Sequence, residues 1–449
     1  MTINEIRGKK IAIAGLGENN KHLARYFDKL GVNYTVFQDW SRPAELIPDL
    51  ENFEIIFRTP GLPYLSEPIQ KAKKAGAEIY SQTKLFFDLC PARIIGVTGT
   101  KGKGTTASLI GKILKEAGRR VWLAGNIGRD PFEFLDEIWP GDDVVLELSS
   151  FQLQDLRKSP HIAVVLIVTS DHLDHHKTVD EYVKAKQPIV NFQWPQDFAV
   201  LNYDSQITRS FSTLTPGKII WNSITQAVRP GCYVEEDKIM FDSVPSIPAK
   251  GEKTSGESME IMKTSEVKLI GRFNLENVTA AICAVAASGV SDIAAIVRAV
   301  SDFRGLPHRL EFIREFKEVK FYNDSFSTTP ETAMAAISAF AEPIILIAGG
   351  SEKNADYGGL ARIIADGKVK ALLAIGKTGS KIAALARKAG YQGRIIDQNL
   401  EDMKEIVSAC NQIAAPGDIA LLSPAAASFD MFKNYKDRGE QFRESVENL

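Results

Sequence analysis

The sequence has little of what marks secreted, membrane-spanning or nucleic-acid-binding proteins. Its four cysteines are widely scattered along 449 residues, which suits neither a disulfide framework nor a zinc module. No apolar run reaches the ~18 residues that a transmembrane helix needs, and the N-terminal residues do not form a secretion signal. Lysine and arginine (54) nearly balance aspartate and glutamate (56), so a broad basic surface for nucleic acid is not expected. We therefore expect a cytoplasmic protein without membrane insertion and without a nucleic-acid partner.

The clearest motif that is present is a glycine-rich loop after a predicted strand. A short apolar strand that begins at Arg93 runs into a loop that contains Gly99, Thr100, Lys101, Gly102, Lys103, Gly104, Thr105 and Thr106. Glycines allow backbone N–H groups to face an anion, the lysine adds a positive charge, and the helix expected from Thr105 or Thr106 directs its N-terminal dipole there. We predict a site for a nucleoside triphosphate; a glycine-rich turn without a ligand is the alternative.

This loop departs from the strict phosphate-loop pattern in one way that matters for a metal. Gly104 follows Lys103, where the pattern has a hydroxyl residue that ligates Mg²⁺. Thr105, one residue later, or a water is therefore expected to take that position.

Two further segments place metal-ligating groups at strand ends. Glu147 ends the apolar strand from Asp143, where a carboxylate suits Mg²⁺; capping of the next helix is the alternative. A run rich in histidine and aspartate follows the next strand and contains His172, the candidate ligand of a second Mg²⁺. Such a run also occurs in two-metal hydrolases, but the phosphate loop argues against that class. Lys186 follows Tyr182 by four positions on a predicted helix and by itself is an ordinary surface lysine.

Alternating strand and helix patterns indicate three α/β domains, which also fits 449 residues at about 150 per domain. We predict a Rossmann-like N-terminal domain (1–91), a central P-loop domain with a parallel sheet (92–301) and a Rossmann-like C-terminal domain (302–449). In the first domain, the turn at Gly15-Leu16-Gly17 lacks the third glycine of a dinucleotide fingerprint, and Asp39 follows the second strand. An acid there accepts hydrogen bonds from a ribose or a base; a solvated loop aspartate is the alternative.

Six motifs together resemble those of the Mur ligases of peptidoglycan synthesis and occur in that family's order along nearly the whole chain. They are Gly96-x-Thr98-Gly99-Thr100-x-Gly102-Lys103, Glu147-x-Ser149-Ser150-Phe151-Gln152-Leu153, Asp171-His172-x-Asp174, Gly305-Leu306-Pro307-His308-Arg309, Asn323-Asp324-Ser325 and Leu422-Ser423-Pro424-Ala425. The tail from Ser423 to Gly439 is typical of the member that joins D-glutamate to UDP-N-acetylmuramoyl-L-alanine. The resemblance implies an ATP- and Mg²⁺-dependent amide ligase that works through an acyl phosphate. Its three domains would bind the UDP sugar, ATP and the amino acid.

The resemblance also implies roles for individual residues. Lys103 would hold the ATP phosphates, Glu147 and His172 would ligate two Mg²⁺ ions, and Lys186 would be carbamylated so that it becomes a carboxylate ligand. The positions that match further ATP contacts are Asn274, Asn277, Arg309 and Asp324. Those that match contacts to the UDP sugar are Leu16, Asp39, Thr59 and Asn126. Those that match the glutamate pocket are Thr328, Lys353, Ser428, Phe429 and Tyr435. We expect a monomer.

Two positions depart from the family pattern. Phe326 stands where the D-glutamate-adding member usually has a lysine, and one lost charge-assisted bond to a carboxylate is worth about 1.5–3 kcal/mol. Glu18 lies beside the first glycine turn, where it would repel a diphosphate. The alternatives are therefore a relative that adds L-glutamate or another amino acid, a ligase similar to folylpolyglutamate synthase, and a nucleotide-binding protein that has lost catalysis.

Overall fold

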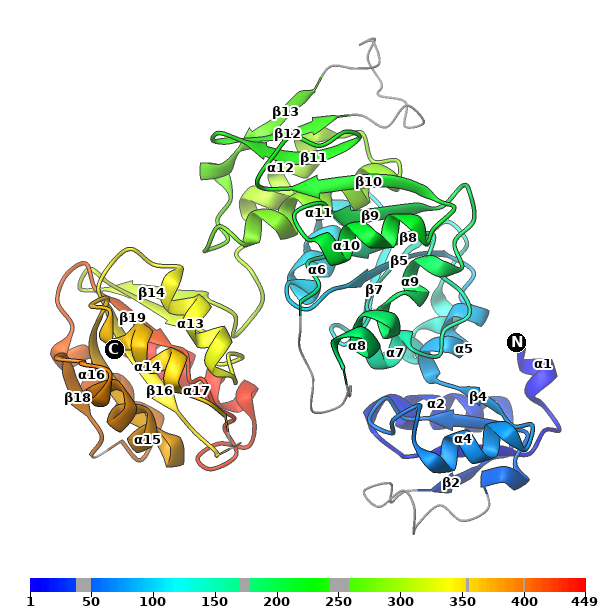
Figure 1. Cartoon of the computed structure of the whole chain (residues 1–449), viewed down its shortest axis with the longest axis horizontal. Helices are drawn as coiled ribbons and strands as arrows, with labels where there is room; N and C mark the ends of the chain where they lie inside the picture. Colours follow the sequence, from blue (N-terminus) through cyan, green and yellow to red (C-terminus); the bar gives the residue numbers. More distant parts are fainter. Residues whose placement is uncertain (38–49, 170–177, 243–257, 353–354, 399) are drawn as a thin grey trace. The chain divides into compact units, whose positions relative to one another are not determined.

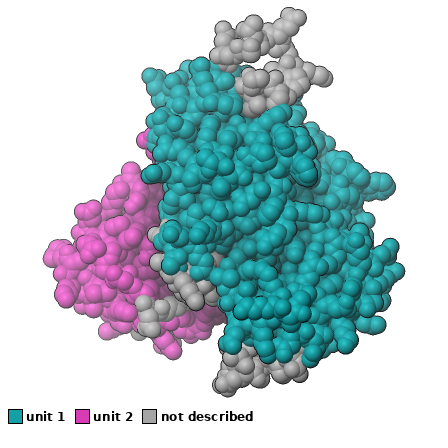
Figure 2. All heavy atoms as spheres, turned by 45° about the vertical axis from the view of Figure 1, so that its right-hand side comes forward, with its two compact units in different colours: residues 1–267, 275–302 teal, residues 268–274, 303–449 magenta. Residues whose placement is uncertain are grey.

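The computed structural model describes residues 1–37, 50–169, 178–242, 258–352, 355–398 and 400–449 (Figure 1). They form a mixed α/β fold of two compact units (Figure 2). Unit 1 contains residues 1–267 and 275–302, and unit 2 contains residues 268–274 and 303–449. None of the helices in the described ranges has the length and apolar character that crossing a bilayer requires.

The first sheet lies in unit 1 and is parallel, as the alternating sequence pattern predicts. Its strands are β1 (Ile11–Ala14), β2 (Thr35–Phe37), β3 (Ile55–Arg58) and β4 (Glu78–Tyr80), in the order β2-β1-β3-β4. The helices around it are α1 (Ile3–Ile6), α2 (Glu18–Leu30), α4 (Glu67–Lys74) and α5 (Gln82–Leu89), with the 3₁₀ turn η1 (Leu50–Asn52). Every residue of β1 and β3 is buried, which is typical of the central strands of a parallel sheet.

The second sheet of unit 1 has nine strands within the described residues, in the order β13-β12-β11-β10-β9-β8-β5-β7-β6. The strands are β5 (Arg93–Thr98), β6 (Val121–Gly125), β7 (Asp143–Glu147), β8 (Ile162–Val165), β9 (Phe198–Asn202), β10 (Lys218–Ser223), β11 (Gly231–Glu235), β12 (Lys238–Asp242) and β13 (Met259–Lys263). The helices are α6 (Lys103–Glu116), α7 (Ser150–Leu153), α8 (Val179–Lys186), α9 (Pro188–Asn191), α10 (Gln206–Ser210), α11 (Asn274–Ala287) and α12 (Ile293–Asp302). The 3₁₀ turns are η2 (Pro131–Glu133), η3 (Leu135–Glu137), η4 (Phe211–Thr213) and η5 (Thr264–Glu266).

The prediction of a parallel central sheet holds from β6 to β11 and is wrong for β12 and β13. These two strands pair antiparallel with their neighbours. Only Glu236 and Asp237 connect β11 to β12, and Glu236 takes the left-handed backbone of a tight turn, with φ 53°. A parallel connection needs about a dozen residues or more, so a link this short produces a hairpin.

Unit 2 contains the third sheet, in the order β14-β15-β19-β16-β17-β18. Its strands are β14 (Glu311–Phe316), β15 (Val319–Asn323), β16 (Ile344–Gly349), β17 (Val369–Ile375), β18 (Arg394–Ile396) and β19 (Ile419–Leu422). Helices α13 (Pro330–Ser338), α14 (Gly358–Ala365) and α15 (Gly376–Lys388) share one apolar cluster, whereas α16 (Met403–Ile413) and α17 (Tyr435–Glu447) share another. The sheet is parallel, as predicted, except for β14, which forms an antiparallel hairpin with β15.

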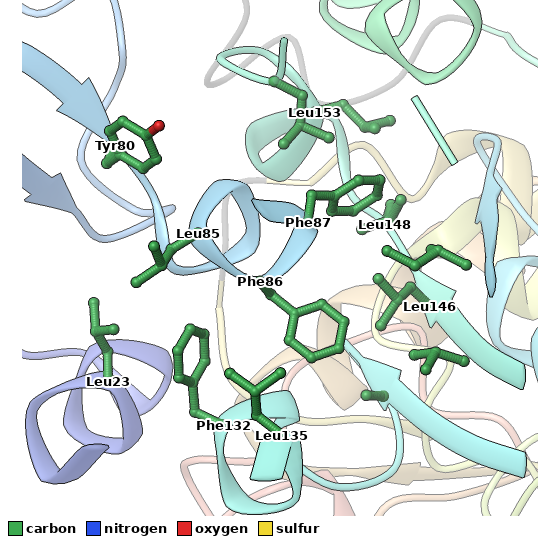
Figure 3. Packing of buried hydrophobic residues seen from close by; sticks show 14 of the residues in the cluster. Leu23, Tyr80, Leu85, Phe86, Phe87, Phe132, Leu135, Leu146, Leu148 and Leu153 are labelled. Carbon is green, nitrogen blue, oxygen red and sulfur yellow. The ribbon is translucent and has the colours of Figure 1, made fainter. Parts of the chain in front are cut away.

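A continuous apolar core joins the first two sheets within unit 1 (Figure 3). Leu85 and Phe86 of α5 belong to the same buried cluster as Phe132 of η2 and Leu146 of β7. The rings of Phe86 and Phe132 meet edge to face with centroids 6.3 Å apart. The predicted boundary near residue 91 therefore falls inside unit 1, and it stays a prediction.

Candidate functional site

The phosphate loop is formed by backbone that only glycine tolerates. Gly99 has φ +152° and Gly102 has φ +83°. A Cβ on Gly99 would lie 2.7 Å from the Cβ of Leu166, and one on Gly102 would collide with Oδ1 of Asn277. Helix α6 begins at Lys103, earlier than the predicted Thr105 or Thr106. Its first N–H groups therefore belong to the loop, which suits binding of an anion.

The lysine of the loop lies over the same backbone. Lys103 Nζ donates hydrogen bonds to the carbonyl of Gly99 at 3.2 Å and to that of Thr100 at 3.0 Å. Of the other loop residues, Lys101 is exposed, whereas Gly104, Thr105 and Thr106 are buried in the first turn of α6. The ammonium group and the start of the helix thus face one small region, as recognition of a polyphosphate requires.

The N-terminal part of α11 lies against this loop. Thr106 Oγ1 donates to Oδ1 of Asn277 at 3.1 Å, and both residues are buried. Asn274, the first residue of α11, is also buried and donates from its side chain to the carbonyl of Ile270 at 2.7 Å. The structure therefore brings Asn277 to the phosphate loop, and its role as an ATP contact stays a prediction.

Glu147 ends β7 beside the strand that leads into the loop. It is 5% exposed, and its partner in the neighbouring strand β5 is Val97. The backbone N–H of Asn126 donates to the carbonyl of Glu147 at 3.2 Å, although the side chain of Asn126 is exposed. The candidate substrate residue Asn126 and the candidate metal ligand Glu147 thus lie at the carboxyl ends of the neighbouring strands β6 and β7.

Lys186 is not the ordinary surface lysine that its position in the sequence indicates. It ends α8 and is 1% exposed. Its Nζ donates to the carbonyl of Gly99 at 3.2 Å and lies 4.4 Å from the centre of the Tyr182 ring. Lysine is rarely this deeply buried in a folded protein, so its placement at the base of the phosphate loop points to a function for the amine.

The candidate metal ligand His172 lies outside the described residues, as do Asp39 and Lys353. Thr169 comes shortly before His172 in the chain, and its backbone N–H and carbonyl both bond to the hydroxyl of Thr100, at 2.9 and 3.1 Å. Within the described residues there is no group of three His, Cys, Asp or Glu side chains arranged to hold a metal. The two-ion site stays a prediction.

In the first sheet, the glycine turn that holds Leu16 meets the end of β3. Thr59 is 5% exposed, and its backbone N–H donates to the carbonyl of Ala14 at 3.0 Å. A Cβ added to Gly17 would lie 2.9 Å from Thr59 Oγ1, so the two loops are in close contact. These loops follow the carboxyl ends of β1 and β3, the usual place for a ligand on an open parallel sheet.

In unit 2, the ring of Phe326 contacts one charged and one aromatic side chain. The guanidinium of Arg309 lies 3.8 Å above the centre of the Phe326 ring, and the ring of Tyr435 meets it edge-on at 5.0 Å. Asp324 is nearby and buried, and burial raises the pKa of its carboxyl to about 6. Phe326 therefore holds an arginine by stacking where the family pattern has a lysine.

The remaining predicted pocket residues lie on the loops after the neighbouring strands β15 and β19. Ser428 is 2% exposed, Thr328 is partly exposed and Phe429 is 70% exposed. Arg438 clamps the two loops. It is fully buried and donates to the carbonyls of Ser325, at 2.9 Å, and Ala426, at 3.2 Å. The sequence alone does not indicate this clamp, because only the fold places α17 beneath both loops.

Comparison with known proteins now defines the family. Residues 97–285 match the Mur ligase middle domain, and residues 308–426 match the Mur ligase glutamate ligase domain. The sequence is 38% identical to the UDP-N-acetylmuramoylalanine–D-glutamate ligase of Acetivibrio thermocellus, with 99% of this chain and 97% of that protein covered. The chain belongs to the Mur ligase family. A protein of the same name from Symbiobacterium thermophilum is 39% identical, with 98% of each chain covered.

Solved Mur ligase structures share the fold. MurF from Acinetobacter baumannii superposes with a TM-score of 0.61 at 18% identity, covering 85% of this chain and 81% of that one. UDP-N-acetylmuramate-alanine ligase MurC from Thermotoga maritima has a TM-score of 0.59 at 16% identity, covering 98% and 99%. The family matches and the full-length relatives confirm the Mur ligase resemblance inferred from the six motifs.

Proposed function

We propose that this Mur ligase adds D-glutamate to UDP-N-acetylmuramoyl-L-alanine in the cytoplasm, as a monomer, at the expense of ATP. Relatives named for this activity are 34–39% identical over 98–100% of the chain. The geometric observation that carries the proposal is the burial of Lys186 against the phosphate loop, beside the strand end at which Glu147 lies. A protein that only binds a nucleotide has no evident use for a buried amine at that place.

The reaction requires activation of a carboxylate. The alanyl carboxylate attacks the γ-phosphorus of ATP, so that a C–O–P linkage forms and ADP leaves. The amine of glutamate then attacks the carbonyl carbon of this acyl phosphate, phosphate leaves, the nitrogen loses a proton, and an amide remains. Water must be kept out, because it would hydrolyse the acyl phosphate.

The chain offers residues for each part of this chemistry. The loop N–H groups and Lys103 would bind the phosphates, while Thr105, Glu147, His172 and a carbamylated Lys186 would hold two Mg²⁺ ions. Bound Mg²⁺ would neutralise charge on the phosphate and carboxylate oxygens. The glycine cradle, which any Cβ would fill, and the carboxylate of Glu147 fit such a ligand set. Carbamylation is supported by the placement of Lys186, which is 1% exposed and whose Nζ lies 3.2 Å from the carbonyl of Gly99 at the base of the phosphate loop.

The other expected contacts come from the family resemblance. The candidates for the nucleotide sugar are Leu16, Asp39, Thr59 and Asn126, and those for ATP are Asn274, Asn277, Arg309 and Asp324. The candidates for glutamate are Thr328, Lys353, Ser428, Phe429 and Tyr435.

A second candidate is a ligase that adds L-glutamate or another amino acid to the same acceptor. The observation that favours it is Phe326, whose apolar ring stacks on Arg309 where the family pattern has a lysine, so that one charge-assisted bond to a carboxylate is missing. The full-length relatives favour the D-glutamate ligase over a folylpolyglutamate-type enzyme or an inactive nucleotide-binding protein.

The test is phosphate release from ATP with Mg²⁺ and UDP-N-acetylmuramoyl-L-alanine, in the presence of D-glutamate, L-glutamate or no amino acid, with product masses determined. We expect release that depends on D-glutamate. Release that depends on L-glutamate would establish the second candidate, and no release with either would contradict both.

A further inference from the structure

Arg58 forms a buried ion pair that links the first sheet to the central sheet. Arg58 ends β3, and its Nε lies 3.2 Å from Oδ2 of Asp155, which follows α7. The two side chains are 1% and 2% exposed. Among the ion pairs of the described residues, this is the one in which both side chains are almost fully buried. Asp155 also accepts a hydrogen bond from Ser81 at 3.4 Å.

Stability alone does not explain this pair. Removing two charges from water is unfavourable, and apolar residues of similar size often replace buried ion pairs without loss of stability. What a guanidinium provides and an apolar side chain does not is a planar set of donors in fixed directions. The other donors of Arg58 therefore indicate what the residue does.

Those donors connect the two loops on either side. Nη1 donates to the carbonyl of Leu62 at 3.1 Å, and Nη2 donates to the carbonyl of Phe151 at 2.7 Å. Leu62 closes the turn that starts at Thr59, through a hydrogen bond of 3.0 Å between its N–H and the Thr59 carbonyl. A single side chain thus fixes the position of this turn relative to α7.

Helix α7 is in turn tightly linked to Glu147. It begins three residues after the end of β7, with Ser149 as its N-cap. Ser149 Oγ accepts from the N–H of Gln152 at 3.3 Å, and Gln152 Oε1 accepts from the N–H of Ser149 at 2.9 Å. This reciprocal capping box leaves little freedom between α7 and Glu147. Arg58 therefore connects the turn at Thr59 to the strand end that presents Glu147.

We propose that Arg58 is a positioning residue that sets the distance between the loop holding the nucleotide sugar and the edge where the carboxylate is phosphorylated. The inference rests on the proposed function. A long substrate fixed at its UDP end reaches the γ-phosphate correctly only if these two loops keep a constant separation. A misplacement of ~1 Å at a reacting centre is enough to lower the rate about 100-fold.

The experiment compares the wild type with R58K, with R58M and with the double variant R58M/D155L, which replaces the buried charges by apolar groups and keeps the core filled. Thermal unfolding identifies the folded variants. Calorimetry gives the Kd of ATP and of UDP-N-acetylmuramoyl-L-alanine separately, and phosphate release gives kcat. We expect the double variant to fold and to lose kcat about 10- to 100-fold, with each Kd changed less than about threefold. R58K keeps the positive charge but not the planar set of donors, so its kcat should lie between those of the double variant and the wild type.

Lys29 and Asp136 provide a matched control. Their ion pair of 2.6 Å also links α2 to the segment after β6, but the side chains are 65% and 49% exposed. K29M should leave kcat unchanged, because an exposed pair contributes little. A folded R58M/D155L with the kcat of the wild type, or with a loss confined to the Kd of the nucleotide sugar, would overturn the proposal. An inactive wild type would instead refute the proposed function, and this inference with it.

Discussion

Replacing Asp324 by asparagine should stabilise unit 2 at neutral pH. The carboxyl of Asp324 is 5% exposed, and burial raises its pKa from an ordinary value of 3.8 to about 6. Its oxygens accept hydrogen bonds from Ser423 Oγ at 2.7 Å and from the N–H of Leu310 at 3.2 Å. Asparagine can preserve both contacts, since its oxygen accepts from Leu310 and its amide donates to the hydroxyl.

The direction and size of this change in stability follow from proton linkage. The Asp324 carboxyl binds a proton more tightly in the folded chain than in the unfolded chain. Protonation of Asp324 therefore stabilises the fold fully below pH 3.8, and this stabilisation is lost as the pH rises to about 6. The difference in proton affinity corresponds to about 3 kcal/mol. For a unit of this size, D324N should raise the Tm of unit 2 by about 6–12 °C at pH 7 and leave it nearly unchanged at pH 4. Ligase activity should fall, because Asp324 is a candidate ATP contact.

The assay is thermal unfolding of the full chain between pH 4 and pH 8, with D437N as a control of opposite sign. Hydrogen bonds from the N–H of Lys433 and from Gln441 lower the pKa of Asp437. Its stabilisation is therefore present at neutral pH and lost in acid, and D437N should lower the Tm at pH 7. A D324N variant that is less stable than the wild type at pH 7 would refute the reasoning, because it would mean that Asp324 is stabilised as an anion.

Three further predictions concern the candidate site. F326L removes the ring beneath Arg309 and, with it, a cation–π contact of about 0.5–1 kcal/mol, so the KM for ATP should rise about two- to fivefold. F316L, which removes the ring beside Arg314 on β14, should not change it. K186A should abolish phosphate release, and added short carboxylic acids should restore part of it; a variant that keeps its activity would exclude a carbamate ligand. G102A forces a left-handed alanine against Asn277 and should weaken ATP binding, measured by calorimetry, at least about fivefold.

Local patterns predicted the strands and the phosphate loop because these features depend on residues close together in the chain. The segment Ile419–Leu422, for example, is an uninterrupted apolar run and forms the buried strand β19. Lys186 lies on a helix, as predicted, but its sequence position does not indicate that it is buried against Gly99, 87 positions away. The pair of Arg58 and Asp155 joins residues 97 positions apart, and no periodicity records such a contact.

The core shared by the first two sheets has a consequence for how the chain emerges from the ribosome. Leu85 and Phe86 are synthesised well before Phe132, Leu135 and Leu146, with which they form one buried cluster. Until those later residues are available, the first sheet carries uncovered apolar surface, which favours association with chaperones or with other nascent chains. We therefore expect a fragment of residues 1–91 to aggregate when it is expressed alone. A fragment that extends through β7 and α7 should aggregate much less.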